Sequence, residues 1–302
     1  MNAPRGAHSG TAALLAATDR VHRHVASEET NDVAQVMATV SAEVCYMLPD
    51  VTGASPELVV LTDRAAVQGY YADERNFMEI VSSTVLVGLT ADWYTFHESV
   101  STTREVATGG HYQNDVAILF PVADDGIVGE ILAARRPWHE VYAGVPDPAD
   151  AVGAPEVAAR RREAQGAHQA FLEALAGGAD GLSSFEPSAR IAVVDPTVPD
   201  GAYVASGAGA VGGRCELVGR AIEEPELHVI NRVVGDWYVF AEWAVRGRAR
   251  VGLDGMHAGD PVELRSAGVF PVGASGRLAG EQSYGFWAQG QARSQDGSQE
   301  SR

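Results

Sequence analysis

A seven-residue segment occurs twice in this chain, once in each half. Residues 92–98 read DWYTFHE, and residues 236–242 read DWYVFAE. Four further pairs of similar segments follow in the same order: 42–50 with 189–196, 61–65 with 217–221, 120–126 with 270–276, and 128–130 with 279–281. A repeat of this length exceeds the period of about 20–50 residues that is typical of solenoid proteins. The pattern therefore predicts two complete domains of similar fold.

The length of 302 residues suffices for two domains that each bury their own core. We place the first domain at residues 11–136 and the second at residues 155–288. The segment 137–154 is rich in Pro, Ala, Asp and Gly, which is typical of a linker. Residues 289–302 contain mainly polar residues and Gly, so we expect a disordered tail.

The charge of the chain excludes several classes of function. Its formal net charge is −18, which argues against binding to nucleic acid or to anionic membranes. All 22 basic residues are arginine, so a Schiff-base lysine, a pyridoxal-phosphate anchor and a P-loop lysine are excluded. We expect a cytoplasmic protein, because the sequence shows no secretion signal, no membrane span, and two cysteines that we expect to be reduced.

Hydrophobic periodicity predicts the same order of elements in both halves. In the first, helices are predicted at residues 11–26, 30–40 and 64–81, and strands at 44–48, 85–100, 115–122 and 127–134. In the second, helices are predicted at 157–175 and 179–185, and strands at 191–194, 227–251, 262–272 and 278–287. Helices followed by antiparallel strands indicate an α+β fold. We expect two cone-shaped domains, each a curved, mostly antiparallel sheet wrapped around its N-terminal helices, with a mouth suited to a small apolar ligand.

The halves differ where the first carries a helix with Tyr70 and Tyr71. The distance from Leu61 to Asp92 exceeds that from Leu217 to Asp236, so the sequence suggests that the second half has lost this helix. It also suggests a glycine-rich insertion at residues 201–213, which contains the segment GAGAVG at 207–212. That segment matches the dinucleotide-binding pattern, but it follows a Pro-containing loop, and we expect it to be a flexible loop.

These blocks resemble the nuclear transport factor 2-like (NTF2-like) superfamily, most clearly in residues 189–196, 217–222 and 270–281. The superfamily includes SnoaL-like polyketide cyclases, ketosteroid isomerases, limonene epoxide hydrolases and scytalone dehydratases. The resemblance implies a cofactor-independent cyclase, isomerase or epoxide-opening enzyme that transfers protons on a hydrophobic polyketide, polyether or steroid-like molecule. The two-domain layout is also similar to that of the polyether epoxide-opening cyclases, whose turn aspartate Asp195 matches; Asp50 is shifted from that position.

The candidate site residues are carboxylates, histidines and aromatic residues near the repeated blocks. The catalytic candidates are His97, Tyr46, Asp50, Asp195 and Glu242, and the substrate-binding candidates are Tyr70, Tyr71, Trp93, His111, Trp237 and Trp243. On the strands 92–99 and 236–243 alternate residues share a face, but the sequence leaves open which face lines the pocket. Glu130 and Glu281 close the strand after each hairpin, where an exposed glutamate is the simpler interpretation.

Neither a metal nor a nucleotide is expected. His22 and His24, two residues apart on a helix, point away from each other. The alternative to an enzyme is a non-catalytic protein that binds a small molecule or serves as a scaffold. In either case we expect the two halves to pair as an intrachain pseudo-dimer, and a further homodimer stays open. The first half, with the helix at Tyr70 and Tyr71, is the favoured location of the pocket.

Overall fold

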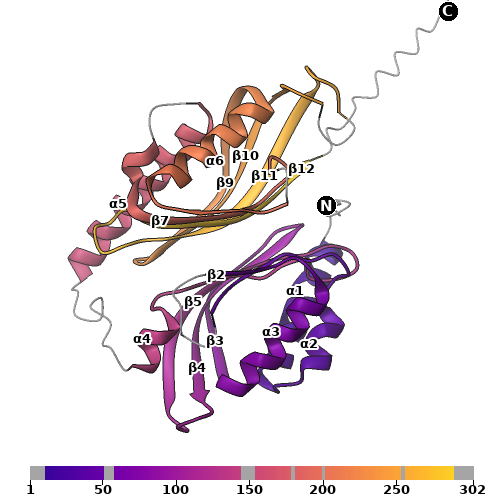
Figure 1. Ribbon diagram of the computed structural model, residues 1–302, viewed down its shortest axis with the longest axis vertical. Coiled ribbons are helices and arrows are strands. Elements are labelled where there is room, and N and C mark those ends of the chain that lie inside the picture. The colour runs from indigo at the N-terminus through magenta and orange to yellow at the C-terminus, as the bar shows by residue number, and fades with distance from the viewer. Residues whose placement is uncertain are drawn as a thin grey trace, which may run out of the picture.

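The computed structural model describes residues 11–50, 58–143, 154–177, 181–198, 201–252 and 256–288. Two α+β units follow one another along the chain (Figure 1), so the predicted fold class is confirmed. The first unit contains α1 (Thr11–Glu29), α2 (Val33–Thr39), β1 (Tyr46–Pro49), β2 (Leu58–Leu61), α3 (Arg64–Phe77), β3 (Met78–Thr90), β4 (Tyr94–Glu105), β5 (His111–Pro121), β6 (Ile131–Ala134) and α4 (Trp138–Tyr142).

The second unit repeats this order. It contains α5 (Ala154–Leu175), the 3-10 helix η2 (Gly181–Ser184), β7 (Phe185–Val194), β8 (Tyr203–Ser206), α6 (Ala208–Ala221), β9 (Ile222–Val234), β10 (Tyr238–Ala249), β11 (Pro261–Pro271) and β12 (Leu278–Ala288). Among the described residues, no helix combines the length and the apolar character needed to cross a membrane.

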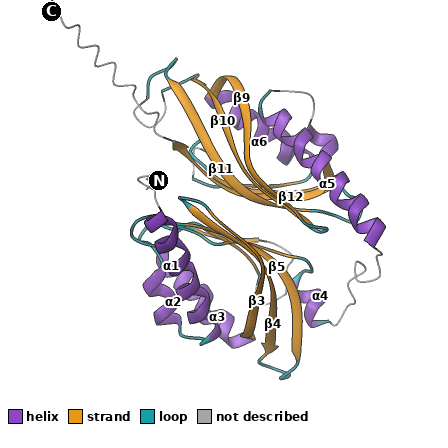
Figure 2. Ribbon diagram, turned by 180° about the vertical axis from the view of Figure 1, so that it is seen from behind, coloured by secondary structure: helices purple, strands orange, loops and turns teal. Residues whose placement is uncertain are grey.

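Each unit forms one six-stranded sheet, with the orders β2-β1-β6-β5-β4-β3 and β8-β7-β12-β11-β10-β9. Neighbouring strands are antiparallel except for the pairs β1–β6 and β7–β12, which are parallel. In each unit the helices cover the outer face of the sheet, and the other face lies toward the second sheet (Figure 2). A small molecule bound between helices and sheet is therefore shielded from the other unit.

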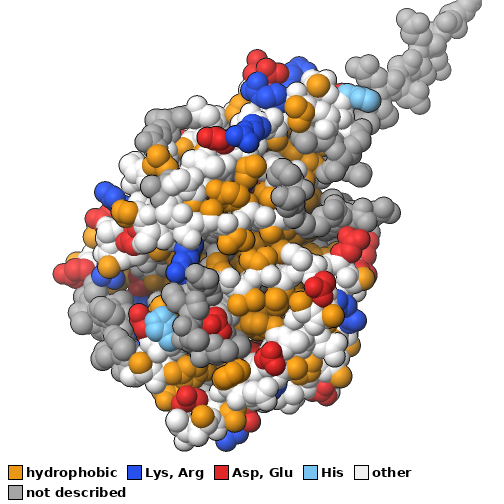
Figure 3. Space-filling model, viewed as in Figure 1, with side chains coloured by type: hydrophobic (Ala, Val, Ile, Leu, Met, Phe, Trp, Pro, Cys, Tyr) orange, Lys and Arg blue, Asp and Glu red, His pale blue; other side chains and the backbone are white. Residues whose placement is uncertain are grey.

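The two sheets pack on one another through an apolar layer. Phe96 of β4 and Phe240 of β10 stack with ring centroids 4.1 Å apart. The contact has approximate two-fold symmetry, because the Tyr94 hydroxyl donates to Glu242 (3.0 Å) and the Tyr238 hydroxyl donates to Glu98 (2.9 Å). On the face shown in Figure 3, apolar side chains gather along the boundary between the units. Burial of this layer accounts for the aromatic residues in the repeated segment.

The sequence correspondence between residues 61–65 and 217–221 is wrong. The segment 61–65 leads into the start of α3, whereas 217–221 is the end of α6. Both helices have 14 residues and sit between a short strand and a 13-residue edge strand. The second unit has therefore not lost the helix, and 201–213 is not an inserted loop but contains β8 and the start of α6. Because the two segments are similar, the sequence comparison aligned the start of α3 with the end of α6, which is about three helical turns away from the register that the structure shows.

The correct correspondence between the units is a shift of 144 positions over the helices and the first long strands. Arg64 and Ala208 begin α3 and α6, Met78 and Ile222 begin β3 and β9, and Tyr94 and Tyr238 begin β4 and β10. His24 of α1 and His168 of α5, also 144 apart, each lie edge-on to a phenylalanine ring, Phe120 and Phe270 respectively. This shift allows the two units to be compared residue by residue.

The glycine segment at 207–212 begins α6 after β8, so our expectation of a flexible loop is wrong. The structure still lacks the parallel unit that a dinucleotide site needs, because β8 pairs antiparallel with β7 and β9 lies at the opposite edge of the sheet. Gly207, at a φ of +83°, adopts the left-handed conformation that glycine tolerates and turns the chain into the helix.

Other boundaries also differ from the sequence prediction: the predicted helix 64–81 ends at Phe77, the predicted strand 127–134 begins at Ile131, and the run 227–251 covers parts of β9 and β10. The run 85–100 spans parts of two strands, β3 and β4; of the predicted helix 179–185, residues 181–184 form a 3-10 helix and Phe185 begins β7, while residues 179 and 180 lie outside the described residues. Residues 138–142 of the predicted linker form α4, where Trp138 and Val141 pack with Met78 and Val116 of the first unit. Residues 144–153 of the linker and the tail 289–302 lie outside the described residues.

Candidate functional site

A cavity of about 60 Å³, with a mouth open to solvent, lies between the helices and the sheet of the first unit. Residues of α1, α3 and α4 form one side, and residues of β1 and of β3 to β6 form the other. Apolar side chains dominate the lining. The polar groups with an ionisable side chain that border it are Glu28, Glu74, Glu130, His97, Tyr70 and Tyr71.

A buried polar network occupies one end of this cavity. His24, which is fully buried, places Nδ1 2.6 Å from Thr39 Oγ1 and Nε2 3.1 Å from the Tyr71 hydroxyl. The same Nε2 lies 3.4 Å from Glu28 Oε1 and 3.8 Å from Glu130 Oε2. The Tyr71 hydroxyl donates to Glu130 Oε2 at 2.6 Å. Four elements, α1, α2, α3 and the turn before β6, thus bring polar side chains to one point.

The hydroxyl donors of this network are used by other acceptors, so His24 Nε2 must carry a proton or face another cation. Thr39 donates its hydroxyl hydrogen to the Val36 carbonyl, so it accepts from His24 Nδ1–H. The Tyr71 hydrogen is used by Glu130. A neutral His24 would then direct a bare nitrogen at carboxylate oxygens. Burial opposes a charge on His24, but Glu28 and Glu130 outweigh it and raise its pKa to about 9.

Glu74 and His97 border the cavity with opposite protonation behaviour. Burial raises the pKa of Glu74 to about 8, although Arg75, 3.2 Å away, lowers it; Glu28 and Glu130 add to the rise. Burial, with a further contribution from the nearby His22, lowers the pKa of His97 to about 4. At neutral pH the cavity therefore presents a protonated carboxyl group and a neutral imidazole.

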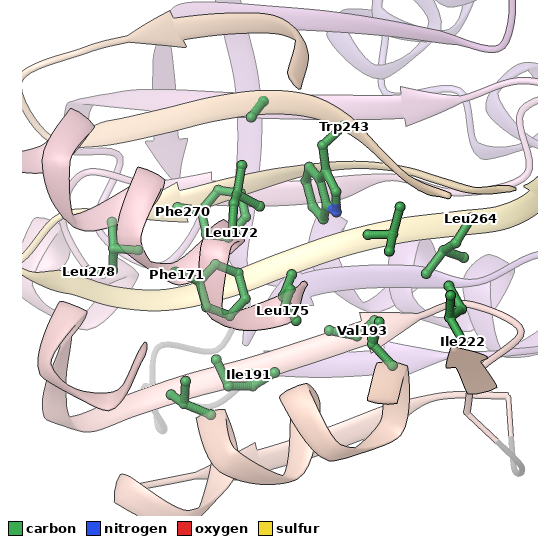
Figure 4. Close-up of a cluster of buried hydrophobic side chains, with 14 of the residues drawn as sticks. Phe171, Leu172, Leu175, Ile191, Val193, Ile222, Trp243, Leu264, Phe270 and Leu278 are labelled. Carbon is green, nitrogen blue, oxygen red and sulfur yellow. The ribbon is translucent and has the colours of Figure 1, made fainter. Parts of the chain in front are cut away.

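The equivalent space in the second unit is filled by side chains. Relative to the first unit, Ser99 is replaced by Trp243, Glu28 by Leu172, Glu74 by Val218 and His97 by Ala241, each 144 positions later. All four replacements belong to the apolar core of that unit, and Figure 4 shows Trp243, Leu172 and Phe270 grouped within it. His168 keeps the position of His24, but neither of its ring nitrogens has a hydrogen-bond partner among the described residues.

The second unit has a buried ion cluster in the region where the first unit has its acid–base groups. Arg214, at the position of Tyr70, lies 2.7 Å from Asp195 Oδ2 and 3.4 Å from Glu281 Oε1, and all three side chains are inaccessible to solvent. The backbone N–H of Thr197 donates to Asp195, and the Ser283 hydroxyl donates to Glu281. Asp195 is thus held by an arginine inside a packed core and does not line the cavity of the first unit.

The structure places four of the predicted site residues around the first cavity. Tyr70, Tyr71 and His97 line it. Tyr46 lies behind it, with its ring edge-on to that of Tyr71 at 6.4 Å. Burial raises the pKa of the Tyr46 hydroxyl, which makes no hydrogen bond of ordinary geometry among the described residues.

Asp50 occupies the position of Asp195 once the register is taken from the structure. A Cβ on Gly129 would come within 2.4 Å of the Cys45 carbonyl, and one on Gly280 within 2.4 Å of the Arg190 carbonyl. Asp50 and Asp195 each follow these carbonyl residues by five positions. Asp50 is half-buried at the end of β1, next to Tyr70, so the shift that the sequence suggested is not present.

The remaining predicted residues do not line this cavity. Glu242 is buried between the two sheets, where it accepts hydrogen bonds from Trp93, Tyr94, Asn231 and Arg265. Trp93 and Trp237 belong to the same inter-unit layer, because the residues that precede each long strand turn toward the other sheet. Trp243 fills the core of the second unit, and His111 is exposed at the start of β5.

Sequence reasoning missed His24, Glu28 and Glu74, and it took Glu130 for an exposed residue. Glu74 follows Val67 by seven positions and Tyr71 by three, so it lies on the buried face of α3. His24 and Glu28 are likewise one turn apart on α1. An ionisable residue at a helix position where the periodicity predicts an apolar one could have identified these residues as buried site candidates.

The ligating atoms of His24, Glu28 and Glu130 lie within 4.8 Å of one another. Within the described ranges, no other group of three or more such residues has this spacing. Our sequence analysis considered only His22 as a second metal ligand beside His24, and His22 is exposed. These three residues are therefore the candidates for a metal or for another cation.

Comparisons with known proteins found similarity of fold only. No protein-family model matches the chain, and no curated protein matches its sequence. An NTF2-like protein from Burkholderia xenovorans LB400 is 11% identical, covers 44% of this chain and 98% of its own, and has a TM-score of 0.35. An LEH-like epoxide hydrolase from M. tuberculosis is 12% identical, covers 44% of this chain and 90% of its own, and has a TM-score of 0.35.

A protein from Catenulispora acidiphila DSM 44928 with a ketosteroid isomerase-like fold gives a similar match. It is 15% identical, covers 45% of this chain and 98% of its own, and has a TM-score of 0.36. Each of these structures spans about one unit of the chain and bears a name from the superfamily that the sequence motifs resemble. The identities and TM-scores assign no activity.

Proposed function

We propose that the first unit is an acid–base active site for a small, mostly apolar molecule and that the second unit is its structural partner. The carrying observation is that a protonated Glu74 and a neutral His97 border one apolar cavity, while the second unit has Val218 and Ala241 at these positions. Proton transfer needs one group that can give a proton and one that can take it. The first unit alone has both.

In this proposal Glu74 donates its proton to a carbonyl or epoxide oxygen of the substrate. His97 accepts a proton from a substrate carbon or from the attacking hydroxyl group. An O–H bond of Glu74 and a C–H or O–H bond of the substrate break, and a new O–H bond and an N–H bond form, so no external reductant or oxidant is needed. Isomerisation, cyclisation and epoxide opening share this step. The apolar lining excludes water and strengthens the electrostatic interactions inside.

The alternative, a protein that only binds or supports, fits the second unit better than the first. That unit is packed with Trp243, Leu172 and Phe270, and it shares an extensive apolar layer with the first unit. The first unit keeps several ionisable groups around open space. Burial of such groups without a function costs free energy of folding.

The substitution Ser99→Trp is expected to abolish binding in the first cavity. It gives the first unit the residue that fills the second, and a cavity of about 60 Å³ leaves little other room. Binding of cyclohexanone or cyclohexene oxide is followed by ¹⁹F NMR of 5-fluorotryptophan-labelled protein, in which Trp138 borders the cavity. The Trp138 signal is assigned with Trp138→Phe. Ser99→Ala is the control and should keep the shift. A shift that persists in folded Ser99→Trp protein contradicts the location.

Proton transfer should be fastest between about pH 5 and pH 7. Glu74 must stay protonated, so activity should fall above its pKa of about 8, and His97 must stay neutral, so activity should fall below its pKa of about 4. The measurement is exchange of the α-hydrogens of cyclohexanone in D₂O by NMR across this range. Glu74→Gln should lower the exchange rate by about 10²–10⁴-fold. An exchange rate equal to that of wild type in this variant would refute the role of Glu74.

A further inference from the structure

Three side chains of metal-ligating types, His24, Glu28 and Glu130, meet at the polar end of the cavity, where the Tyr71 hydroxyl at 3.1 Å is the one hydrogen-bond partner of ordinary length that His24 Nε2 has among the described residues. The distances from His24 Nε2 to Glu28 Oε1 and Glu130 Oε2, 3.4 and 3.8 Å, exceed the range of about 2.7–3.2 Å for N–H···O hydrogen bonds. Two ligands bound to one metal at about 2.0–2.2 Å in tetrahedral geometry stand about 3.4 Å apart. The separation of His24 and Glu28 matches this spacing, and the ligating atoms of all three side chains lie within 4.8 Å of one another.

The charges of these three side chains also favour a bound cation. With both carboxylates ionised and a proton on His24, one net negative charge is left inside the protein, since Glu28, Glu130 and His24 are all buried; this cost is reflected in the pKa of Glu130, which burial raises. A divalent ion bound by two carboxylates and a neutral imidazole leaves none. A neutral site is favoured because an uncompensated charge in a poorly solvated interior is costly.

The groups behind the three ligands hold them in the orientation that metal sites use. Metal-binding histidines commonly donate their second ring N–H to an oxygen acceptor, and His24 Nδ1 lies 2.6 Å from Thr39 Oγ1, which accepts. Metal-binding carboxylates are commonly hydrogen-bonded in turn, and Glu130 accepts from Tyr71. His24 Nε2 faces the two carboxylates and the Tyr71 hydroxyl at 3.1 Å, so an ion bound there would take the place of the contact with Tyr71.

We infer that His24, Glu28 and Glu130 form a binding site for one divalent first-row transition-metal ion at the edge of the cavity. One imidazole nitrogen and two carboxylate oxygens suit Zn²⁺, Mn²⁺, Fe²⁺ or Co²⁺, whereas Mg²⁺ and Ca²⁺ prefer oxygen ligands alone. Glu28 and Glu130 both line the cavity, so a small molecule bound there would lie beside the ion. The inference goes beyond the proposed proton transfer, because Glu74 and His97 are not among the ligands.

The second unit supports the assignment as an internal comparison. His168 and Glu281 keep the positions of His24 and Glu130, but Leu172 stands in place of Glu28. The carboxylate of Glu281 is instead paired with Arg214. A chain that retains one complete ligand set should therefore bind one ion and not two.

The test is titration of the chelator-treated full-length protein with Co²⁺, followed by visible absorption. Wild type should saturate at one equivalent. Glu28→Leu, which reproduces the second unit, should weaken binding by more than about 100-fold, the upper end for changes in outer-shell groups. The matched control is Glu226→Leu, which removes the carboxylate from the exposed pair of His228 and Glu226 and should leave the affinity unchanged.

Glu28→Gln keeps the side-chain shape and is the variant to titrate if circular dichroism shows that Glu28→Leu does not fold. It should also weaken Co²⁺ binding strongly. Absence of a saturable absorption in wild type would overturn the inference. Equal affinity in wild type and in either folded Glu28 variant would overturn it as well, because it would place the ion at a surface site.

Discussion

Replacement of Arg214 by methionine is expected to destabilise the protein by about 3–5 kcal/mol, the cost of leaving buried charges without their partner. Arg214 has no solvent exposure, and its guanidinium group lies 2.7 Å from Asp195 and 3.4 Å from Glu281. Removal of the arginine leaves two carboxylates facing each other in an apolar core. The free energy of unfolding, measured by urea denaturation at neutral pH, reports the effect.

Two further variants separate loss of charge balance from loss of packing. Asp195→Asn and Glu281→Gln added to Arg214→Met should recover most of the stability, because no unpaired charge is left. Arg220→Met on the same helix breaks only the exposed pair with Glu216 and should change stability by less than about 1 kcal/mol. Equal losses in Arg214→Met and Arg220→Met would show that the cluster does not stabilise the second unit.

Truncation of Trp243 to alanine is expected to cost about 3–5 kcal/mol, as for other large-to-small changes in cores. Trp243 is fully buried and contacts the ring of Phe270, with centroids 5.6 Å apart. Loss of the indole should leave an apolar cavity that binds benzene, as engineered apolar cavities do. Denaturation with and without benzene measures both effects.

Ser99→Ala at the equivalent position of the first unit is the matched control for Trp243→Ala. Ser99 borders an existing cavity, so its truncation should change stability by less than about 0.5 kcal/mol, the usual range for substitutions that break no packing. A comparable loss in both variants would mean that the two units are packed alike, contrary to the structure.

The repeat and the fold class were accessible from the sequence because both rest on local patterns. The segments 92–98 and 236–242 recur as the starts of β4 and β10, and their alternating aromatic residues reflect strands with two different faces. The face could not be chosen, since both faces of these strands are buried. Only the structure shows Tyr94 and Phe96 against the other sheet and His97 toward the cavity.

The candidate site was predicted in part. Tyr70, Tyr71 and His97 border the cavity, yet the carboxyl groups that accompany them come from α1, α3 and the turn before β6. Glu242 looked equivalent to a catalytic carboxylate, but it binds Trp93 and Arg265 between the units. No local pattern relates residues so far apart along the chain.

By itself, the sequence determined that the chain folds twice into the same α+β unit, because periodicity and turn residues act over a few positions. It also determined that lysine chemistry is excluded. The tertiary structure decided which unit keeps open space. In the first unit, Ser99 leaves space opposite the helices, and Glu28 lies one turn from His24. In the second unit, Trp243 fills that space, and Leu172 takes the place of Glu28. Volume and charge in a core are sums over side chains from several elements, and they exist only once those elements are packed.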